Sequence, residues 1–384
     1  MAKKTAYGAG NIRHRSDGRW EGRVVVGTDP STGKLIRRSV YAATQRECRR
    51  QMTEMQQTID TGTYQEPSRM TVSEWMKEWL ETFARPKVKP LTLAAYDAAI
   101  RNHIDPAIGT VKVQDLRGVH VQRLYNSMLT AGKSPKTIKN TGAILHKAMG
   151  IAVKQGYLRS NPCDAAELPK VTRAEIKPLS DDEIAAFLRA IQGHRMEALF
   201  AVCLFAGLRE GEALGLSWGQ VDFAAGTLTI SQQLQREKKA GGRYYIAPTT
   251  KSGKPRIVKP PEVAMRYLRA ERTRQAERRL AAGAAWSNPN DLVFTTDDGR
   301  YLAIATVYRA FKRIAASIGR PDARPHDLRH TAATVALAAG ADLKSVQDML
   351  GHATASFTLS TYAHATDRMR EDTADRVQRY YDAL

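Results

Sequence analysis

The first 62 residues show the hydrophobic pattern of a small sheet followed by one helix. Turn-forming residues stand at 16–18 and 29–33, and between them apolar side chains alternate with charged ones, as in a half-buried strand. A capping box at 44–47 begins a helix that we expect to run to about Thr61. Segment 1–62 therefore predicts a small α+β domain with a three-stranded sheet packed on a helix. The apolar face carries Trp20, Val24 and Val26, and the charged face carries Arg19, Glu21 and Arg23.

From residue 70 to residue 163 the apolar positions recur with the helical period. A capping box at 71–74 begins a helix that carries Trp75 and Trp79, which we interpret as core residues rather than as a platform for stacking bases. Further helices with one apolar face follow until Asn161-Pro162 ends the run. The pattern predicts an all-α bundle over 70–163.

The last segment, 175–384, contains both helical and strand patterns. We expect a mainly helical domain with a small β-sheet, so that the chain is multidomain, with predicted domains at 1–62, 70–163 and 175–384. Helices are expected at 181–192, 196–206, 210–216, 261–281, 304–318, 327–339, 343–350 and 368–382, and strands at 227–235, 243–247 and 256–259.

The composition excludes several classes of protein. Hydrophobic residues make up 42% of the 384 residues, which is ordinary for a soluble globular chain. No uninterrupted apolar run approaches the roughly 18 residues of a transmembrane helix, and no apolar run follows the basic start as in a secretory signal peptide. The three cysteines stand far apart, which fits neither a disulfide framework nor a zinc site and favours a reducing cytosol.

The net charge of +20 favours a polyanionic partner, in the first place nucleic acid. An anionic membrane is an alternative, but no basic amphipathic helix or lipidation motif stands out, and a simple effect on solubility also stays open. Arg19 and Arg23 lie on a basic sheet face of a kind that can enter a DNA major groove. Lys136 and Lys139, at the start of a helix, form either a phosphate clamp or an exposed basic turn.

The first candidate for chemistry is Arg209, which lies between Gly207 and Gly211 in a predicted turn between two apolar helices. A guanidinium group held there can bind two phosphate oxygens at once through its planar fork. Taken alone, the pattern is better explained by an exposed loop arginine.

A second string, residues 326–331, follows Pro325 and begins an apolar helix. Its His326 and Arg329 share one helix face, which pairs a proton-transfer group with a cation at a helix N-terminus that favours anions. His326 and His330 also have a spacing that can bind a metal ion. No glutamate stands in the metalloprotease arrangement and no third ligand is close in sequence, so we predict no metal site.

A third string carries His352, just past a helix end marked by Gly351, and then Tyr362 in a polar stretch. Together the three strings resemble the tyrosine recombinases, also called phage integrases, over about residues 70–384. Segment 1–62 looks like the arm-binding domain of integrases from phages and conjugative transposons. The positions that match the family's active site are Arg209, Lys251 in the turn between two strands, His326, Arg329, His352 and the nucleophile Tyr362, with Glu212 at the family's acidic position.

The resemblance implies DNA cleavage by attack of Tyr362, which gives a 3′-phosphotyrosine that keeps the bond energy for rejoining. Two non-bridging oxygens gain charge in this step, and the two arginines would bind them, with a further hydrogen bond from His352. Lys251 is the expected general acid for the leaving 5′ oxygen, and His326 is the expected acceptor of the tyrosine proton. These cationic side chains can replace metal ions as the charge sink, so we expect no cofactor.

A protein of this family would be a site-specific DNA recombinase that integrates and excises a mobile genetic element. It would act as a homotetramer that joins two DNA sites and binds double-stranded DNA at core and arm sequences, with an excisionase or a DNA-bending accessory protein as further partners and no membrane. A protein with these properties is expected to be located in the cytoplasm of a prokaryotic host, in association with the nucleoid. The C-terminal helix with Tyr380 and Tyr381 would dock either on a neighbouring protomer or on its own domain.

Two other functions compete with the integrase. A type IB topoisomerase shares the chemistry but only relaxes supercoils, and the arm-binding segment and the string 350–352 argue against it. A DNA-binding regulator that has lost catalysis is the second alternative, and the complete set of active-site residues argues against it. The DNA target sequence, and an origin in a prophage or in a conjugative transposon, stay open.

Overall fold

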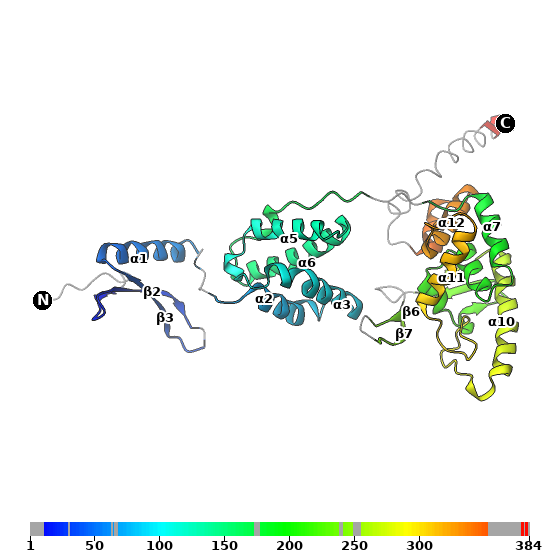
Figure 1. Cartoon of the computed structure of the whole chain (residues 1–384), viewed down its shortest axis with the longest axis horizontal. Helices are drawn as coiled ribbons and strands as arrows, with labels where there is room; N and C mark the ends of the chain where they lie inside the picture. The colour runs from blue at the N-terminus through cyan, green and yellow to red at the C-terminus, as the bar shows by residue number, and fades with distance from the viewer. Residues whose placement is uncertain are drawn as a thin grey trace. The chain divides into compact units, whose positions relative to one another are not determined.

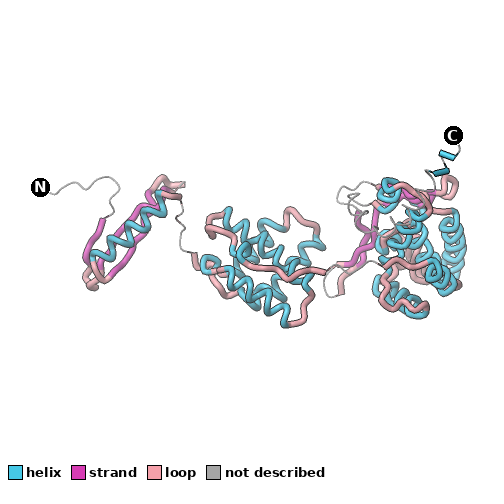
Figure 2. The backbone as a smooth tube through the Cα atoms, turned by 90° about the horizontal axis from the view of Figure 1, so that it is seen from above, coloured by secondary structure: helices cyan, strands magenta, loops and turns pink. Residues whose placement is uncertain are grey.

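The structure is a computed structural model, shown in Figures 1 and 2. The chain divides into two compact units, Met1–Thr172 and Arg173–Leu384. The residues that the structure describes are 11–29, 31–62, 64, 68–172, 177–237, 241–248, 255–351, 378, 379, 381 and 382.

The first unit begins with a three-stranded antiparallel sheet in the order β1-β2-β3, and one face of this sheet packs on helix α1 (Figure 2). Thr44 caps the helix by accepting a hydrogen bond from the Glu47 N–H at 3.2 Å. The sheet and helix meet closely at Gly22, where a Cβ atom would lie 2.3 Å from Met52 Sδ. The predicted three-stranded sheet with one helix is confirmed. The elements are β1 (Asn11–His14), β2 (Trp20–Thr28), β3 (Leu35–Ala42) and α1 (Gln45–Asp60).

A helical bundle with its own hydrophobic core follows (cyan in Figure 1). Trp75 is fully buried, and its indole N–H donates to the Ala148 carbonyl at 3.1 Å. Trp79 is also buried, so both tryptophans are core residues, as their spacing predicts. The bundle consists of α2 (Val72–Glu78), η1 (Trp79–Ala84), α3 (Pro90–Ala99), η2 (Ile100–Ile104), α4 (Asp105–Ile108), η3 (Val113–Asp115), α5 (Gly118–Thr130), α6 (Pro135–Lys154) and η4 (Pro162–Ala165).

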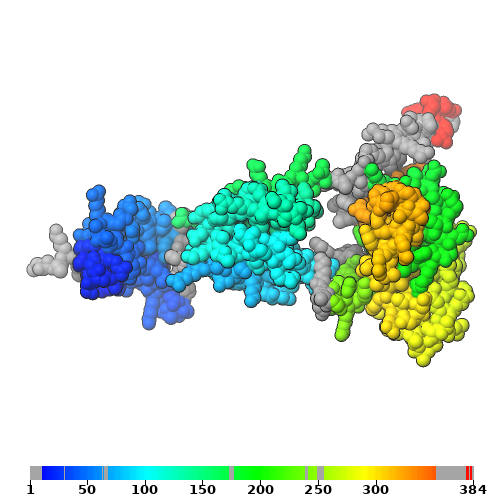
Figure 3. Space-filling view, in the orientation of Figure 1, coloured from blue at the N-terminus to red at the C-terminus, as the bar shows by residue number. Residues whose placement is uncertain are grey.

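The second unit is built around helix α8, which is apolar on nearly all sides and buried between α10 and α12. Helices α7 and α11 also pack on each other, and α11 contributes to the face seen in Figure 3. The helices are α7 (Asp181–Ile191), α8 (Glu197–Ala206), α9 (Glu210–Leu214), η5 (Trp218–Gln220), α10 (Glu262–Ala282), η6 (Gly283–Ala285), α11 (Ile304–Ser317), α12 (Pro325–Ala338) and α13 (Leu343–Leu350). The strands are β4 (Val221–Asp222), β5 (Thr227–Ile230), β6 (Gln232–Arg236), β7 (Tyr244–Pro248) and β8 (Arg256–Val258).

The single strand predicted over 227–235 is wrong, because the structure has two strands there in two different sheets. β5 belongs to a three-stranded sheet with β4 and β8, whereas β6 pairs with β7. Side chains hold the break between them: Gln220 Nε2 donates to Ser231 Oγ at 2.6 Å, and Gln232 Nε2 donates to the Gly215 carbonyl at 2.8 Å. The alternation of side chains continues across the break, so the pattern cannot reveal it.

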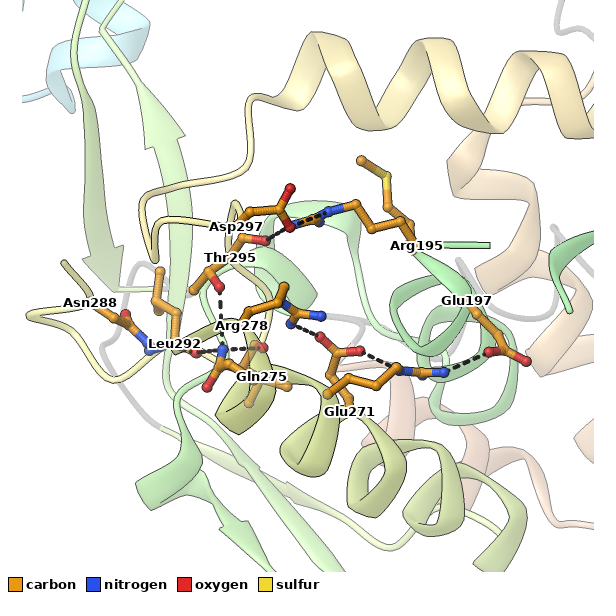
Figure 4. A network of polar contacts seen from close by, with 12 residues as sticks. Arg195, Glu197, Glu271, Gln275, Arg278, Asn288, Leu292, Thr295 and Asp297 are labelled. Carbon is orange, nitrogen blue, oxygen red and sulfur yellow. Dashed lines mark hydrogen bonds and ion pairs between the residues drawn. The ribbon is translucent and has the colours of Figure 1, made fainter. Parts of the chain in front are cut away.

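A polar network fastens the long helix α10 to the rest of the second unit (Figure 4). The Gln275 side-chain amide donates to the carbonyls of Leu292 and Val293 at 2.9 and 2.8 Å. Glu271 is buried and accepts from Arg278 at 2.5 Å and from Arg274 at 3.3 Å. Because a buried carboxylate needs charged partners, this network fixes which face of α10 turns inward. Among the described residues, none of the helices has the length and apolar character that crossing a membrane requires.

Candidate active site

Arg209 lies at the turn between α8 and α9. Gly207 ends α8 in the left-handed region with φ of +63°, which turns the chain so that Arg209 becomes the N-cap residue of α9. Both the backbone N–H and the side chain of Arg209 are bound to Glu212, at 3.0 Å from N to Oε2 and at 2.6 Å from Nη1 to Oε1. The side chain is 38% exposed, so its guanidinium group is fixed on one side and accessible on the other.

Glu212 is the centre of this cluster, with a side chain that is only 1% exposed. Its two oxygens accept from Arg256 at 2.9 and 2.6 Å, in addition to Arg209, and Arg329 Nη1 lies 4.0 Å away. Burial by itself would raise the pKa of this carboxyl, but the hydrogen bonds and charges of Arg256 and Arg209 outweigh burial and lower the pKa to about 2. Glu212 is therefore ionised at neutral pH and holds the arginines in place.

Arg329, in the first turns of α12, is also almost completely buried, at 1% exposed. Its Nη1 donates to the Gly207 carbonyl at 2.7 Å, and its Nη2 donates to the Leu350 carbonyl. One guanidinium group thus bridges the end of α8 and the end of α13. Its planar fork reaches both carbonyls, which the single ammonium group of a lysine cannot do.

Three consecutive carbonyls at the end of α13 each accept a hydrogen bond from a different arginine. Arg256 Nε binds the Met349 oxygen at 3.1 Å, Arg329 binds the Leu350 oxygen, and Arg209 Nη2 reaches the Gly351 oxygen at 3.4 Å. Cations at a helix C-terminus are favoured by the helix dipole. The arginine cluster therefore anchors the chain directly before the position of His352.

Arg256 is the residue of this cluster that the motifs do not identify. It stands on β8 between Pro255 and Ile257, and its side chain is mostly buried, at 13% exposed. The sequence gives no signal for it, because Ile257 and Val258 are both apolar. Only the structure shows that Ile257 is exposed and Val258 is buried, so that Arg256 shares the inward face with Val258. An arginine at an inward strand position needs an acidic partner, and here that partner is Glu212.

His326 lies in the first turn of α12, close enough to Arg329 and Arg209 for both to affect its titration. His326 as a whole is exposed, but neighbouring protein atoms partly desolvate its ring. This desolvation, followed by the positive charges of Arg329 and Arg209, lowers the pKa of the imidazole. His330 packs edge-on against it with ring centroids 4.7 Å apart, and burial lowers the pKa of His330 to about 4. Both rings are therefore neutral at pH 7, and His326 can accept a proton.

The structure thus brings together Arg209, Glu212, His326 and Arg329 from separate parts of the second unit. Three further positions predicted for the site, Lys251, His352 and Tyr362, lie outside the described residues, as does most of the helix predicted at 368–382. In the first unit Arg19 and Arg23 are exposed on the sheet domain, and Lys136 and Lys139 are exposed at the start of α6.

Comparison with known proteins identifies the family. The model of the phage integrase family matches residues 177–369, and that of the N-terminal SAM-like domain of phage integrases matches residues 71–129. A protein named tyrosine recombinase XerC-like, from Caldanaerobacter subterraneus subsp. tengcongensis, is 31% identical over 98% of both chains. The chain belongs to the phage integrase family of tyrosine recombinases. It is therefore an enzyme that cleaves and rejoins DNA.

Solved structures agree with the fold of this recombinase. The Tn1549 transposon integrase in complex with a circular intermediate DNA has a TM-score of 0.68 at 24% identity, covering 80% of this chain and 99% of that chain. The lambda integrase tetramer bound to a Holliday junction has a TM-score of 0.56 at 18% identity and covers 92% of this chain and 96% of that chain. The fold class predicted from the sequence is confirmed.

Glu210, next to Arg209 in the recombinase, offers a test of the electrostatics of α9. Its Oε1 is buried with no hydrogen-bond partner among the described residues, and burial raises its pKa from 4.5 to about 7. A carboxyl group with a raised pKa destabilises the folded protein when it is ionised. This cost in folding free energy is absent below about pH 4.5, grows as the pH rises, and is complete above about pH 7. We expect Glu210→Gln to raise the free energy of unfolding by about 2–3 kcal/mol at pH 8.5 and to leave it unchanged at pH 4.5.

Urea unfolding of both proteins at the two pH values measures this difference. Glu277→Gln, which removes a charge from an exposed position on α10, serves as the control. A gain in stability that is equal at both pH values would contradict the role of the Glu210 charge.

Proposed function

We propose that this recombinase is an integrase, which cuts and rejoins DNA through a 3′-phosphotyrosine on Tyr362 to integrate and excise a mobile genetic element. The observation that carries the proposal is that Arg209 and Arg329 meet at buried Glu212, near the end of α13, and that His326 lies close enough to both arginines for their charges to affect its titration. The two guanidinium groups and the neutral imidazole thus lie near the end of α13. In the sequence, Tyr362 follows the last residue of this helix, Leu350, by 12 positions. An anionic phosphodiester is the substrate that such a site attracts.

Each residue has a chemical role in this proposal. The accessible guanidinium group of Arg209 holds a non-bridging phosphate oxygen, and Arg329 adds positive charge that the transition state engages more strongly than the ground state does. His326 is neutral at pH 7, so it can take the proton from Tyr362 as the phenol attacks phosphorus. Lys251 gives a proton to the leaving 5′ oxygen. His352 adds a hydrogen bond to the same phosphate.

DNA binding outside the active site is assigned in this proposal to two parts of the first unit, the N-terminal sheet and the helical bundle. The arginines of the N-terminal sheet, including Arg19 and Arg23, contact arm sequences, while Lys136 and Lys139 on the bundle contact phosphates beside the core site. The net charge of +20 makes the affinity depend strongly on salt. Complete strand exchange needs four cuts, so we propose a homotetramer on two DNA sites, in the cytoplasm of a prokaryote, with an excisionase or a DNA-bending protein as accessory factor.

The test uses a nicked suicide duplex that carries the end sequence of the element encoding the protein. Wild type is expected to form a covalent adduct that survives denaturation, with EDTA present and no added metal, and Tyr362→Phe is expected to form none. Tyr308→Phe, at an exposed position on α11, is the matched control and should react like wild type. Tight binding without an adduct in wild type would instead support the non-catalytic DNA-binding protein, and an adduct with Tyr362→Phe would direct the test to Tyr380 and Tyr381.

A second measurement separates the integrase from a type IB topoisomerase. Two duplexes with different end sequences are incubated with the protein, and joined products are sought by amplification across the new junction. An integrase gives recombinant junctions at one defined position. Relaxation of supercoiled plasmid without any junction would favour the topoisomerase.

A further inference from the structure

Glu21 has an unexpected environment on the N-terminal sheet. The alternation along β2 places it on the face opposite α1, where a solvated side chain is expected. Its side chain is nevertheless only 2% exposed. Side chains of the same sheet face cover it, not a helix, and nearly all of its polar partners are arginines.

Three strands contribute hydrogen bonds to this carboxylate. From β1, Arg13 Nε donates to Oε2 at 2.6 Å, and from β2, Arg23 Nε donates to Oε1 at 3.0 Å. From β3, Ser39 Oγ donates to Oε1 at 3.0 Å. Arg15, in the turn after β1, lies 3.6 Å from Oε2 through its Nη1. The carboxylate is thus at the centre of the face, and arginines surround it.

The strand register also places an aromatic ring, that of Tyr41, beside Glu21. Arg13 and Tyr41 are the direct neighbours of Glu21 on β1 and β3. The guanidinium groups of Arg15 and Arg19 lie over the Tyr41 ring, 5.5 and 5.8 Å from its centroid. We call Arg13, Arg15, Arg19, Arg23, Glu21 and Tyr41 the arginine face.

The arginines themselves remain accessible. The side chains of Arg13, Arg15 and Arg23 are 58%, 38% and 47% exposed, although each has an atom close to Glu21. Hydrogen bonds from Arg13, the largest cause, and from Arg23 and Ser39 lower the pKa of Glu21 to about 2, so the carboxylate is ionised at neutral pH. These ion pairs join one buried carboxylate to partly exposed guanidinium groups. Their effect is to reduce the number of positions that long, mutually repelling arginine side chains can adopt.

We propose that Glu21 is a positioning residue for DNA recognition, which holds the guanidinium groups of the arginine face at fixed spacing so that they meet one DNA sequence in preference to others. The inference rests on the proposed function, in which this sheet binds arm DNA. Side chains that are already ordered lose less entropy on binding. This advantage in affinity is obtained only where the base edges of the DNA match the fixed positions of the side chains. Glu21 itself does not contact the DNA.

The decisive variant is Glu21→Gln, measured in the full chain. One negative charge is lost, so affinity for a random duplex should rise by about twofold to fivefold, because phosphate binding depends on net charge. Affinity for the preferred arm-type duplex should fall, because the arginines are no longer held. The ratio of specific to non-specific affinity should therefore fall by about tenfold to a hundredfold.

The control is Glu54→Gln, on the exposed surface of α1 in the same unit. The Glu54 side chain is 63% exposed and lies 3.8 Å from Arg50, so the variant makes the same change in charge without touching the arginine face. It should raise both affinities together and leave their ratio unchanged. A second variant, Ser39→Ala, keeps the charge and removes one hydrogen bond from Glu21, so a smaller fall of the ratio in the same direction is expected.

The arm-type probe is the duplex that wild type enriches from a randomised library and that the double variant Arg13→Ala, Arg23→Ala no longer enriches. If wild type enriches no such duplex, the arm-binding function of the sheet itself is wrong. If wild type enriches one and Glu21→Gln keeps the specificity ratio, only the positioning role is overturned. Thermal unfolding followed by circular dichroism identifies a variant that fails to fold, in which case Ser39→Ala decides.

Discussion

Replacing Arg329 with lysine is expected to lower the rate of covalent adduct formation by about a hundredfold to a thousandfold, with little effect on DNA affinity. The guanidinium group bridges the carbonyls of Gly207 and Leu350, and so joins the ends of α8 and α13. A lysine keeps the positive charge but can donate along only one of these directions from the same position. The ammonium group would then lie in a different position from the guanidinium group, and it would stabilise the negative charge that develops on the phosphate in the transition state less well.

Single-turnover cleavage of the suicide duplex measures the rate, and fluorescence anisotropy with the same duplex measures the affinity. Arg313→Lys, at an exposed position on α11, is the matched control and should react at the wild-type rate. Both assays are run at a temperature at which circular dichroism shows each variant to be folded. A change of less than about threefold in the rate, or an equal loss of affinity and rate, would contradict a role for Arg329 in the transition state.

Glu212→Gln is expected to lower the free energy of unfolding of the second unit by about 3–5 kcal/mol at pH 7. The carboxylate is 1% exposed and binds Arg209 and Arg256 directly, so its removal leaves buried positive charge without compensation. Arg209 also loses its orientation, and adduct formation should fall together with stability.

The pH dependence of this effect has a definite sign. The pKa of Glu212 falls from 4.5 to about 2 in the folded protein, so the carboxylate contributes its full stability above about pH 4.5. That contribution is lost as the pH falls from about 4.5 toward 2. Wild type and Glu212→Gln should therefore differ less at pH 3.5 than at pH 7.

Urea unfolding at pH 7 and pH 3.5 provides the comparison. The control is Glu262→Gln, which breaks an exposed ion pair with Arg269 on α10 and should change the stability by less than about 1 kcal/mol. If the difference in the free energy of unfolding between wild type and Glu212→Gln were the same at both pH values, the stabilising role of the ionised Glu212 carboxylate would be contradicted.

Local interactions explain how much of the fold the sequence predicts. The capping box at 71–74 marks the start of α2, and the structure has both of its reciprocal hydrogen bonds between Thr71 and Glu74. The hydrophobic periods of the bundle and of the strand around Val24 predict the faces that are buried. Caps and periodicity act within a few residues, so they are visible in the chain itself. The break at Ser231 is not, because it depends on Gln232 reaching Gly215.

The candidate site divides in the same way. Arg209, His326 and Arg329 stand in recognisable strings, and the structure brings them together, while Lys251, His352 and Tyr362 stay predictions. The pattern assigns Glu21 to a solvated face because alternation separates the two faces of a strand without showing what neighbouring strands place there. Only the pairing of three strands surrounds this carboxylate with arginines.

The sequence by itself determined the enzyme family, the fold class and most of the helices, because each depends on residue types at short spacing. The tertiary structure decided how the cations are held. Arg256, Arg329 and Arg209 bind carbonyls across 93, 122 and 142 residues of chain, through Met349, Gly207 and Gly351. Burial of the apolar surfaces of α8, α12 and α13 brings these groups within hydrogen-bond distance, and no local pattern encodes that distance.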